Sequence, residues 1–316
     1  MKPMIVTLRN KRTILKSKTK IMKSFNSTVI LLTAIGIKAS DAQSIPSGKL
    51  WTVVQNDKVK VHTYMSPAAM FANTSHIIEL ENEIIIVDGQ FFAPYALELK
   101  RATDSIGKPI SRFYISHDHP DHYIGFGDAF PSVKVYALEE TKESIEKDGQ
   151  GVLLQRQAQF GPMIASKLNK PSVIQNPGEE IIGNVKFIFE KSTNHESAVS
   201  LIIKLPEIGI YIAQDIVYNK IHLFVEGNTK GWQEALNKIV KESEYKTILS
   251  GHGKEGGKEL LKDNLDYLDF VEKTITQSKN KDEFKSIILK KYPEYGGEQL
   301  IDIYLNFYLK PHHWSN

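Results

Sequence analysis

Six consecutive residues, HDHPDH at 117–122, constrain this chain more than any other feature. They hold three of its ten histidines and two aspartates, directly after an apolar stretch at 111–116 that we predict to be a strand. A surface loop gains no stability from such clustering, and a packed core could not satisfy so many polar rings. Histidine and carboxylate are ligands for divalent metal ions. The run therefore predicts a metal site on a loop at the end of a strand.

Composition narrows the kind of site. The chain has no cysteine, which excludes disulfides, thiolate ligands and cysteine nucleophiles, so any metal must be held by histidine and carboxylate. Its 41% hydrophobic and 24% charged residues are typical of a globular protein, and 316 residues are enough to bury a large core.

The first 42 residues differ in charge from the rest of the chain. They carry nine Lys or Arg and one acid, so removing their net +8 from the formal net charge of +3 leaves −5 for residues 43–316. A mildly acidic body provides no basic patch for nucleic acid. We therefore expect a small-molecule substrate and no nucleic-acid partner; the sequence leaves the oligomeric state open.

The same segment predicts a secretory signal peptide over residues 1–42. A basic region is followed by an apolar stretch at 29–37 and by small residues up to Ala42. The stretch is too short for a stable membrane span. Met22 is an alternative start, and a membrane-anchoring or disordered basic tail is an alternative interpretation. With the signal removed, the protein would be exported, either periplasmic or secreted.

Strand-like and helical patterns alternate from residue 43 onward. Period-two or continuous apolar patterns predict strands at 50–65, 75–89, 111–116, 185–192, 198–205, 208–217 and 245–253. Helical spacing occurs at 92–106, 139–149 and 231–244. This alternation predicts an α/β fold in a catalytic domain over residues 43–260.

Two further segments have their own character. Residues 261–316 have helical patterns throughout, and we interpret them as a C-terminal helical extension. Residues 150–180 have mixed periodicity. They are either a helix–loop insertion over the site that selects the ligand, or a surface connection without a role.

Other candidate ligands follow predicted strands in the second half. His195 comes just after the strand ending near Lys191, and His252 follows the strand at 245–250. Asp215 ends another apolar stretch, where a carboxylate is poorly explained as core. Strand ends are a usual location for sites in α/β proteins. We therefore expect these three side chains to share a cavity with the histidine run.

Together, the HDHPDH run, His195, Asp215 and His252 resemble the metallo-β-lactamase fold superfamily, whose H-x-H-x-D-H motif is highly specific. Asp88, in IIIVDGQ, resembles the early strand-end aspartate of that superfamily. The resemblance covers roughly residues 50–260. It implies a four-layer αβ/βα sandwich with the helical extension added at its C-terminus.

The resemblance also implies a ligand set for two metals. His117, His119 and His195 would hold the first, and Asp121, His122 and His252 the second. Asp215 would bridge the two. Asp88 is expected to orient the histidine loop through hydrogen bonds instead of binding metal. Two Zn²⁺ per chain are expected, with Mn or Fe as alternatives, because His/Asp sites accept several metals.

Hydrolysis is the chemistry that this set implies. His119 stands where the diiron redox branch has glutamate, and a bridging aspartate resembles the glyoxalase II, lactonase and phosphotriesterase-like branches. Two divalent ions would activate water at neutral pH for attack on an ester, lactone or thioester. Asp121 is expected to orient that water or accept a proton. Tyr218 and His222, which follow Asp215, are candidates to hydrogen-bond the substrate or leaving group.

Two other functions stay open at this point. A class B β-lactamase-like enzyme would suit an exported protein with this motif, although Asp215 argues against it. A metal-dependent binding protein without turnover is the alternative outside the enzymes. Four apolar residues near the expected cavity, and the terminal histidines, are better explained without a functional role: Phe160, Met163, Phe224, Trp232, His312 and His313.

Overall fold

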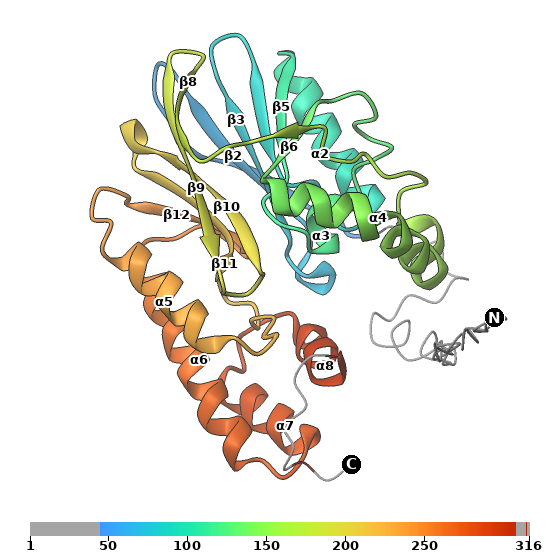
Figure 1. Cartoon of the computed structure of the whole chain (residues 1–316), viewed down its shortest axis with the longest axis vertical. Coiled ribbons are helices and arrows are strands. Elements are labelled where there is room, and N and C mark those ends of the chain that lie inside the picture. Colours follow the sequence, from blue (N-terminus) through green and yellow to red (C-terminus); the bar gives the residue numbers. More distant parts are fainter. Residues whose placement is uncertain (1–44, 308–313, 315–316) are drawn as a thin grey trace, which may run out of the picture.

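A computed structural model describes residues 45–307 and residue 314. Two β-sheets face each other, and helices cover their outer faces (Figure 1). The signal segment proposed for residues 1–42 and the two histidines at 312 and 313 lie outside the described residues. Among the described residues, no helix is long and apolar enough to cross a membrane.

The first sheet contains seven strands in sequence order. Strands β1 to β4 pair antiparallel, and β4 to β7 pair parallel. The strands are β1 (Lys49–Gln55), β2 (Lys60–Met65), β3 (Thr74–Glu79), β4 (Ile84–Val87), β5 (Ile110–Tyr114), β6 (Val135–Ala137) and β7 (Val173–Ile174).

The second sheet contains five strands in the order β12-β11-β10-β9-β8. Only β11 and β12 pair parallel; the others are antiparallel. The strands are β8 (Gly178–Ile182), β9 (Val185–Thr193), β10 (Val199–Leu205), β11 (Ile210–Tyr218) and β12 (Thr247–His252).

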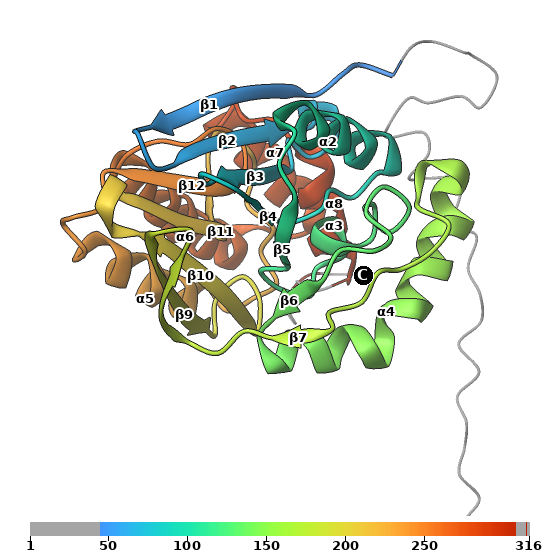
Figure 2. The ribbon, with the colours of Figure 1, turned by 90° about the horizontal axis from the view of Figure 1, so that it is seen from above.

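The helices lie on opposite sides of the two sheets. Helix α4 lies on the side of the first sheet and α5 on the side of the second (Figure 2). The α-helices are α2 (Ala93–Ile106), α3 (Pro120–Tyr123), α4 (Glu139–Phe160), α5 (Thr229–Val240), α6 (Glu259–Gln277), α7 (Lys281–Lys291) and α8 (Glu298–Phe307). Short 3₁₀ turns are η1 (Ala68–Met70), η2 (Gly161–Met163) and η3 (Pro206–Ile208). The predicted αβ/βα layering is confirmed.

Strand β4 shows why the apolar runs fold in this way. Ile85 and Val87 belong to the core between the two sheets, whereas Ile84 and Ile86 belong to the core between the first sheet and its helices. A strand buried on both faces needs a continuous apolar run instead of an alternating one. Each buried side chain of this size contributes about 1.5–3 kcal/mol to folding.

The segment 150–180 is only in part what we expected. Its first third continues α4 to Phe160, and η2 follows. Two strands that the pattern did not predict come next: β7 at the edge of the first sheet and the start of β8 in the second. They are short or half-exposed, so the apolar periodicity that marks other strands is weak there.

The C-terminal helices pack onto the same core as the sheets. Tyr267, Phe284 and Tyr304 belong to the hydrophobic cluster that also holds Ile216 and Trp232. The backbone of this region is joined to the loop after β11, because His222 N donates to Gly296 O at 2.9 Å and Gly296 N donates to Lys220 O at 2.9 Å. The helical extension therefore folds against the loop that follows β11.

Candidate metal centre

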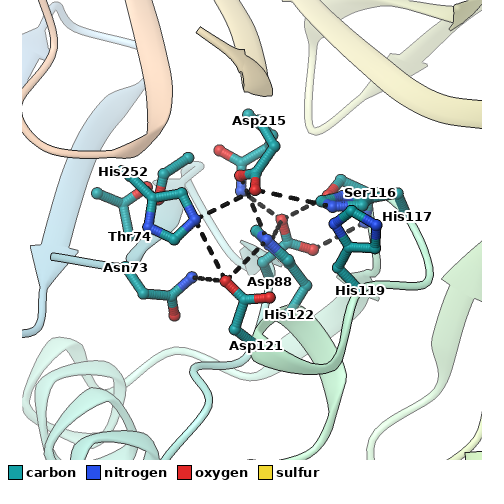
Figure 3. Close-up of polar contacts among 12 residues, drawn as sticks. Asn73, Thr74, Asp88, Ser116, His117, His119, Asp121, His122, Asp215 and His252 are labelled. Atoms are coloured by element: carbon teal, nitrogen blue, oxygen red, sulfur yellow. Dashed lines mark hydrogen bonds and ion pairs between the residues drawn. The ribbon is translucent and has the colours of Figure 1, made fainter. Parts of the chain in front are cut away.

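The histidine run leaves the first sheet at the end of β5 and turns into the short helix α3. His119 is the N-cap residue of α3 and Pro120 its first residue, a position that proline favours because a backbone N–H, which proline lacks, would have no helical partner there. This turn places His117 and His119 before the helix and Asp121 and His122 within it. All four side chains gather in one cluster with Asp215 and His252 (Figure 3).

Asp88 holds the run in place from the end of β4. Its fully buried carboxylate accepts hydrogen bonds from Ser116 N at 2.8 Å, from Ser116 Oγ at 2.6 Å and from His122 Nδ1 at 2.8 Å, and another from Gln214 Nε2. The Ser116 hydroxyl in turn lies 2.9 Å from His117 Nδ1. These contacts leave Nε2 of both histidines facing the cluster. The hydrogen bonds expected between Asp88 and the histidine run are thus present.

One group of potential ligands contains His117, His119, Asp215 and Glu196. Their nearest ligand atoms all lie within 4.8 Å of one another. His117 Nε2 is 3.8 Å from Asp215 Oδ2, and His119 Nδ1 is 2.8 Å from Glu196 Oε1. Glu196 was not among the residues predicted from the sequence.

The second group contains Asp121, His122, Asp215 and His252. His252 Nε2 lies 3.1 Å from Asp215 Oδ2 and 3.2 Å from Asp121 Oδ2. His122 Nε2 lies 3.3 Å from Asp215 Oδ1. Asp215 is thus shared by both groups, which is the position expected of a bridging carboxylate.

We expected Asp215 at the end of a strand. It lies instead within β11. The pairing of β11 with β12 shifts register between Gln214 and Tyr218, and this irregularity interrupts the ladder at the aspartate. Gly251 of β12 leaves room for the side chain, since a Cβ at that position would overlap Asp215 Oδ1. Tyr218 Oη donates to Asp215 Oδ2 at 3.0 Å.

His252 is oriented by the loop between β2 and β3. Its Nδ1 donates to the carbonyl oxygen of Phe71 at 2.7 Å, so Nε2 faces the cluster. Phe71 has φ +70°, a left-handed conformation that a bulky residue rarely adopts. A β-bridge between Asn73 and His252 fixes the same loop against the second sheet.

The ionisation of the cluster reflects burial opposed by neighbouring charge. Burial disfavours the charged form of His252, but the Asp215 and Asp121 carboxylates raise the pKa of this histidine to about 10. Burial likewise opposes ionisation of Asp215, yet His122 and His252 hold its pKa well below the usual value. Burial, together with the charges of His122 and His119, lowers the pKa of His117.

The cluster fits a divalent metal. Buried polar atoms in proteins normally have hydrogen-bond partners. Among the described residues, five buried atoms of the two groups have none: Nε2 of His117 and His122, Oδ1 of Asp215, and both carboxylate oxygens of Glu196. Imidazole nitrogens and carboxylate oxygens converging in one place are a suitable donor set for Zn²⁺ and related ions.

The three other site residues predicted from the sequence are all buried, but their contacts differ. His195 is buried in the turn between β9 and β10, next to Glu196, but it belongs to neither ligand group. Tyr218 is buried, and its ring stacks on His252 with centroids 4.8 Å apart. His222 is fully buried, and its Nδ1 lies 3.0 Å from Tyr267 Oη. His222 thus contacts helix α6 of the C-terminal extension.

The four apolar residues set aside in the sequence are mostly packing residues. Trp232 is buried, and its Nε1 donates to Ile216 O at 2.8 Å. Phe160 packs edge-on against Phe91 and Phe92, and Met163 packs against the same core. Phe224 is different, because its ring lies edge-on to the His119 ring at 5.7 Å. It therefore borders the candidate metal site.

Comparisons with known proteins bear on the fold. No protein-family model matches this sequence, and a search of curated proteins found no match. A metallo-β-lactamase from Pontibacter korlensis has a similar structure, with a TM-score of 0.54 and 17% identity over 70% of this chain and 99% of that one. The DIM-1 metallo-β-lactamase is similar with a TM-score of 0.53 and 16% identity, over 72% of this chain and 98% of that one. The metallo-β-lactamase FIM-1 from Pseudomonas aeruginosa, solved in its mono-zinc form, has a TM-score of 0.50 and 15% identity, over 71% of this chain and 96% of that one. The chain has the metallo-β-lactamase fold, as the resemblance predicted.

Proposed function

We propose that this protein is a dinuclear metal-dependent hydrolase. One observation carries the proposal: Asp215 lies in both four-residue groups of potential ligands, so one carboxylate can serve two ions at once. Paired divalent ions bound there would lower the pKa of water toward 7 and polarise the oxygen under attack. Zn²⁺ is the proposed metal, with Mn and Fe as alternatives.

The residues around the cluster have separate tasks. Asp88 and Phe71 O fix the imidazoles of His122 and His252, so that the ligand atoms stand ready before substrate arrives. Asp121 is 20% exposed at its side chain, whereas His122 and Asp215 are buried. A carboxylate at this boundary is placed to orient water or accept a proton. Tyr218 holds Asp215 through its hydroxyl.

We propose an ester, lactone or thioester as the substrate, a choice that rests on the resemblance to the glyoxalase II and lactonase-like branches. Hydrolysis of a β-lactam is the second candidate. It is favoured by the similar solved structures reported above, which are all called metallo-β-lactamases. Both substrate classes present a carbonyl carbon to the same site, so the fold does not separate them.

One experiment tests both candidates. The purified protein and a His119→Ala variant are compared for metal content by elemental mass spectrometry and for hydrolysis of aryl esters, lactones, thioesters and nitrocefin. About two metal ions per chain and turnover lost in the variant are expected. Turnover of nitrocefin alone would favour the β-lactam candidate. Two bound metals without turnover on any substrate would favour a binding protein, and a protein that binds no metal would overturn the proposal.

We further propose that residues 1–42 direct export, that 43–260 form the catalytic domain and that 261–316 extend it. The basic segment followed by a short apolar stretch supports the first point. Expression of the full chain in a bacterial host, followed by fractionation and N-terminal sequencing, tests it. A mature N-terminus near Gln43 in the periplasm or medium is expected, and an uncleaved cytoplasmic chain would contradict it.

A further inference from the structure

Glu196 is a buried carboxylate at the tip of a hairpin. It lies in the turn between β9 and β10, where a charged side chain normally stays in solvent. Glu196 is only 1% exposed, and neither of its carboxylate oxygens makes a well-aligned hydrogen bond within the described part of the chain. Burying a charge in this way is costly unless a counter-charge compensates for it. The nearest such charge is His119, whose Nδ1 lies 2.8 Å from Glu196 Oε1 and which is itself a candidate metal ligand, so the buried carboxylate belongs to the same cluster.

The turn holds the glutamate inward. Asn194 has φ +60°, and its carbonyl oxygen accepts a hydrogen bond from Asn228 Nδ2 at 2.8 Å. Asn194 N donates to Ala198 O, and His195 N donates to Ser197 O, both at 3.2 Å. With the backbone fixed on both sides, the Glu196 side chain has little freedom to leave the cluster.

The carboxylate lies among the atoms that would bind the first metal. Oε1 is 2.8 Å from His119 Nδ1, and Oε2 is 3.7 Å from His117 Nε2. One ligand atom from each of Glu196, His117, His119 and Asp215 lies within 4.8 Å of the other three. Four ligands at about 2.1 Å from one ion stand about 3.4 Å apart in a tetrahedron, so small side-chain movements would bring all four into one coordination shell.

Charge balance points the same way. Asp121, Asp215 and Glu196 are the carboxylates of the two groups. Three carboxylates offset three of the four positive charges of two divalent ions, whereas Asp121 and Asp215 alone offset two. In a buried site, this extra compensation lowers the cost of bringing both ions out of water.

We propose that Glu196 is a ligand of the first metal ion, and that its oxygen makes this site more accepting of Mn²⁺ than a site with three histidines. The inference rests on the proposed function, because it concerns the metals of that same site. Carboxylate oxygen suits Mn²⁺ better than imidazole does, whereas Zn²⁺ accepts both. Loss of the carboxylate is therefore expected to weaken Mn²⁺ binding more than Zn²⁺ binding.

The test is metal binding, with Glu196→Gln as the variant and Glu226→Gln as the matched control. Glu226 is also near His119, with Oε1 3.6 Å from Nε2, but its side chain is 29% exposed and it belongs to neither group. Each protein, freed of metal by chelation, is titrated calorimetrically with Mn²⁺ and with Zn²⁺. We expect Glu196→Gln to weaken one of two Mn²⁺ sites at least about tenfold and Zn²⁺ less, and Glu226→Gln to stay within about threefold of the wild type.

A second measurement does not depend on a variant that folds. In a crystal structure of the zinc-loaded wild type, a Glu196 oxygen is expected within about 2.2 Å of the first ion. Two bound ions with Glu196 outside coordination distance, or a Glu196→Gln variant with wild-type affinity for both metals, would overturn this inference and leave the proposed function standing. A wild type that binds neither metal would overturn both.

Discussion

Asp88 Oδ2 accepts a hydrogen bond from His122 Nδ1 at 2.8 Å, and the same carboxylate reaches His117 through the Ser116 hydroxyl. One buried aspartate therefore orients a histidine from each of the two ligand groups. Asp88 itself has φ +63°, an unusual conformation for a residue other than glycine. The strain is offset by the hydrogen bonds that this conformation allows.

Replacing Asp88 by asparagine should therefore affect both metals. The amide presents donors to groups that are themselves donors, so buried hydrogen bonds are lost at a cost of about 1–3 kcal/mol. Metal affinity should fall about 10- to 100-fold, as for other residues that orient metal-binding histidines. Chemical denaturation and metal titration measure the two effects. Asp118→Asn is the control, because Asp118 lies in the same run but accepts its hydrogen bond from Ser144 of α4.

Gly251→Ala should displace the shared carboxylate. The added Cβ would overlap Asp215 Oδ1, so either the aspartate or the β11–β12 pairing must shift. Overpacking of this kind costs about 1–3 kcal/mol, and the bound metal should fall from about two ions to one or none. Gly151→Ala is the matched control: Gly151 lies in α4 with open space around its Cβ position, and alanine there should stabilise the helix by about 0.5–1 kcal/mol. Two metals in Gly251→Ala at wild-type affinity would refute the shared role of Asp215.

Stability should depend on pH differently with and without metal. Burial lowers the pKa values of His119 and His252, but Glu196 raises the first to about 10, and Asp215 and Asp121 raise the second to about 10. Because these values exceed the ordinary 6.5, the metal-free protein gains stability from these groups below pH 6.5 and loses it as pH rises through 10.

Metal binding reverses this trend. The two imidazoles must lose their protons to act as ligands, so metal affinity should increase as pH rises from 6.5 toward 10. The difference in melting temperature between zinc-loaded and chelator-treated protein should accordingly be larger at pH 8.5 than at pH 6.5. Thermal unfolding at both pH values measures it, and calorimetry in buffers of different ionisation enthalpy counts the released protons. A difference that shrinks with rising pH would contradict the assignment.

His222 provides a prediction that separates packing from catalysis. Its Nδ1 contacts Tyr267 Oη, and its ring lies 5.6 Å from that of Tyr295. His222→Gln should therefore lower the free energy of unfolding by about 1–3 kcal/mol through the lost buried contact. Metal content should stay at the wild-type value. If stability is unchanged and only turnover falls, the catalytic role expected from the sequence is supported instead.

Much of this fold could be predicted because local signals agree with it. Helix α2 spans Ala93–Ile106 and ends where Gly107 adopts φ +75°, a usual C-cap that sequence reveals. The histidine run was predictable for a different reason: its residue types and spacing have few uses other than binding metal. Asp88 was named through its resemblance to the early strand-end aspartate of the superfamily, and it does lie directly after the buried strand β4.

Glu196 was not predictable from the same signals. In an extended strand, adjacent side chains point to opposite faces, so a ligand at His195 predicts that Glu196 points away. The turn that begins at Asn194 breaks this alternation, and a single left-handed residue is not visible in an apolar pattern. Asp215 was placed at a strand end for a related reason, because a register shift inside β11 leaves no mark on the sequence.

The hydrogen bond from His252 to Phe71 joins residues that are 181 positions apart. Thr74 Oγ1 similarly donates to Ser250 O, 176 positions away, so the second ligand group depends on contacts between residues far apart in the sequence. Contacts of such long range form late in folding, because the entropy of closing the loop must be overcome first. A chain still emerging from the ribosome thus lacks this part of the site until β12 has been made. Metal capture should therefore follow folding of the whole sandwich, and a bound second ion would mark a fully folded molecule.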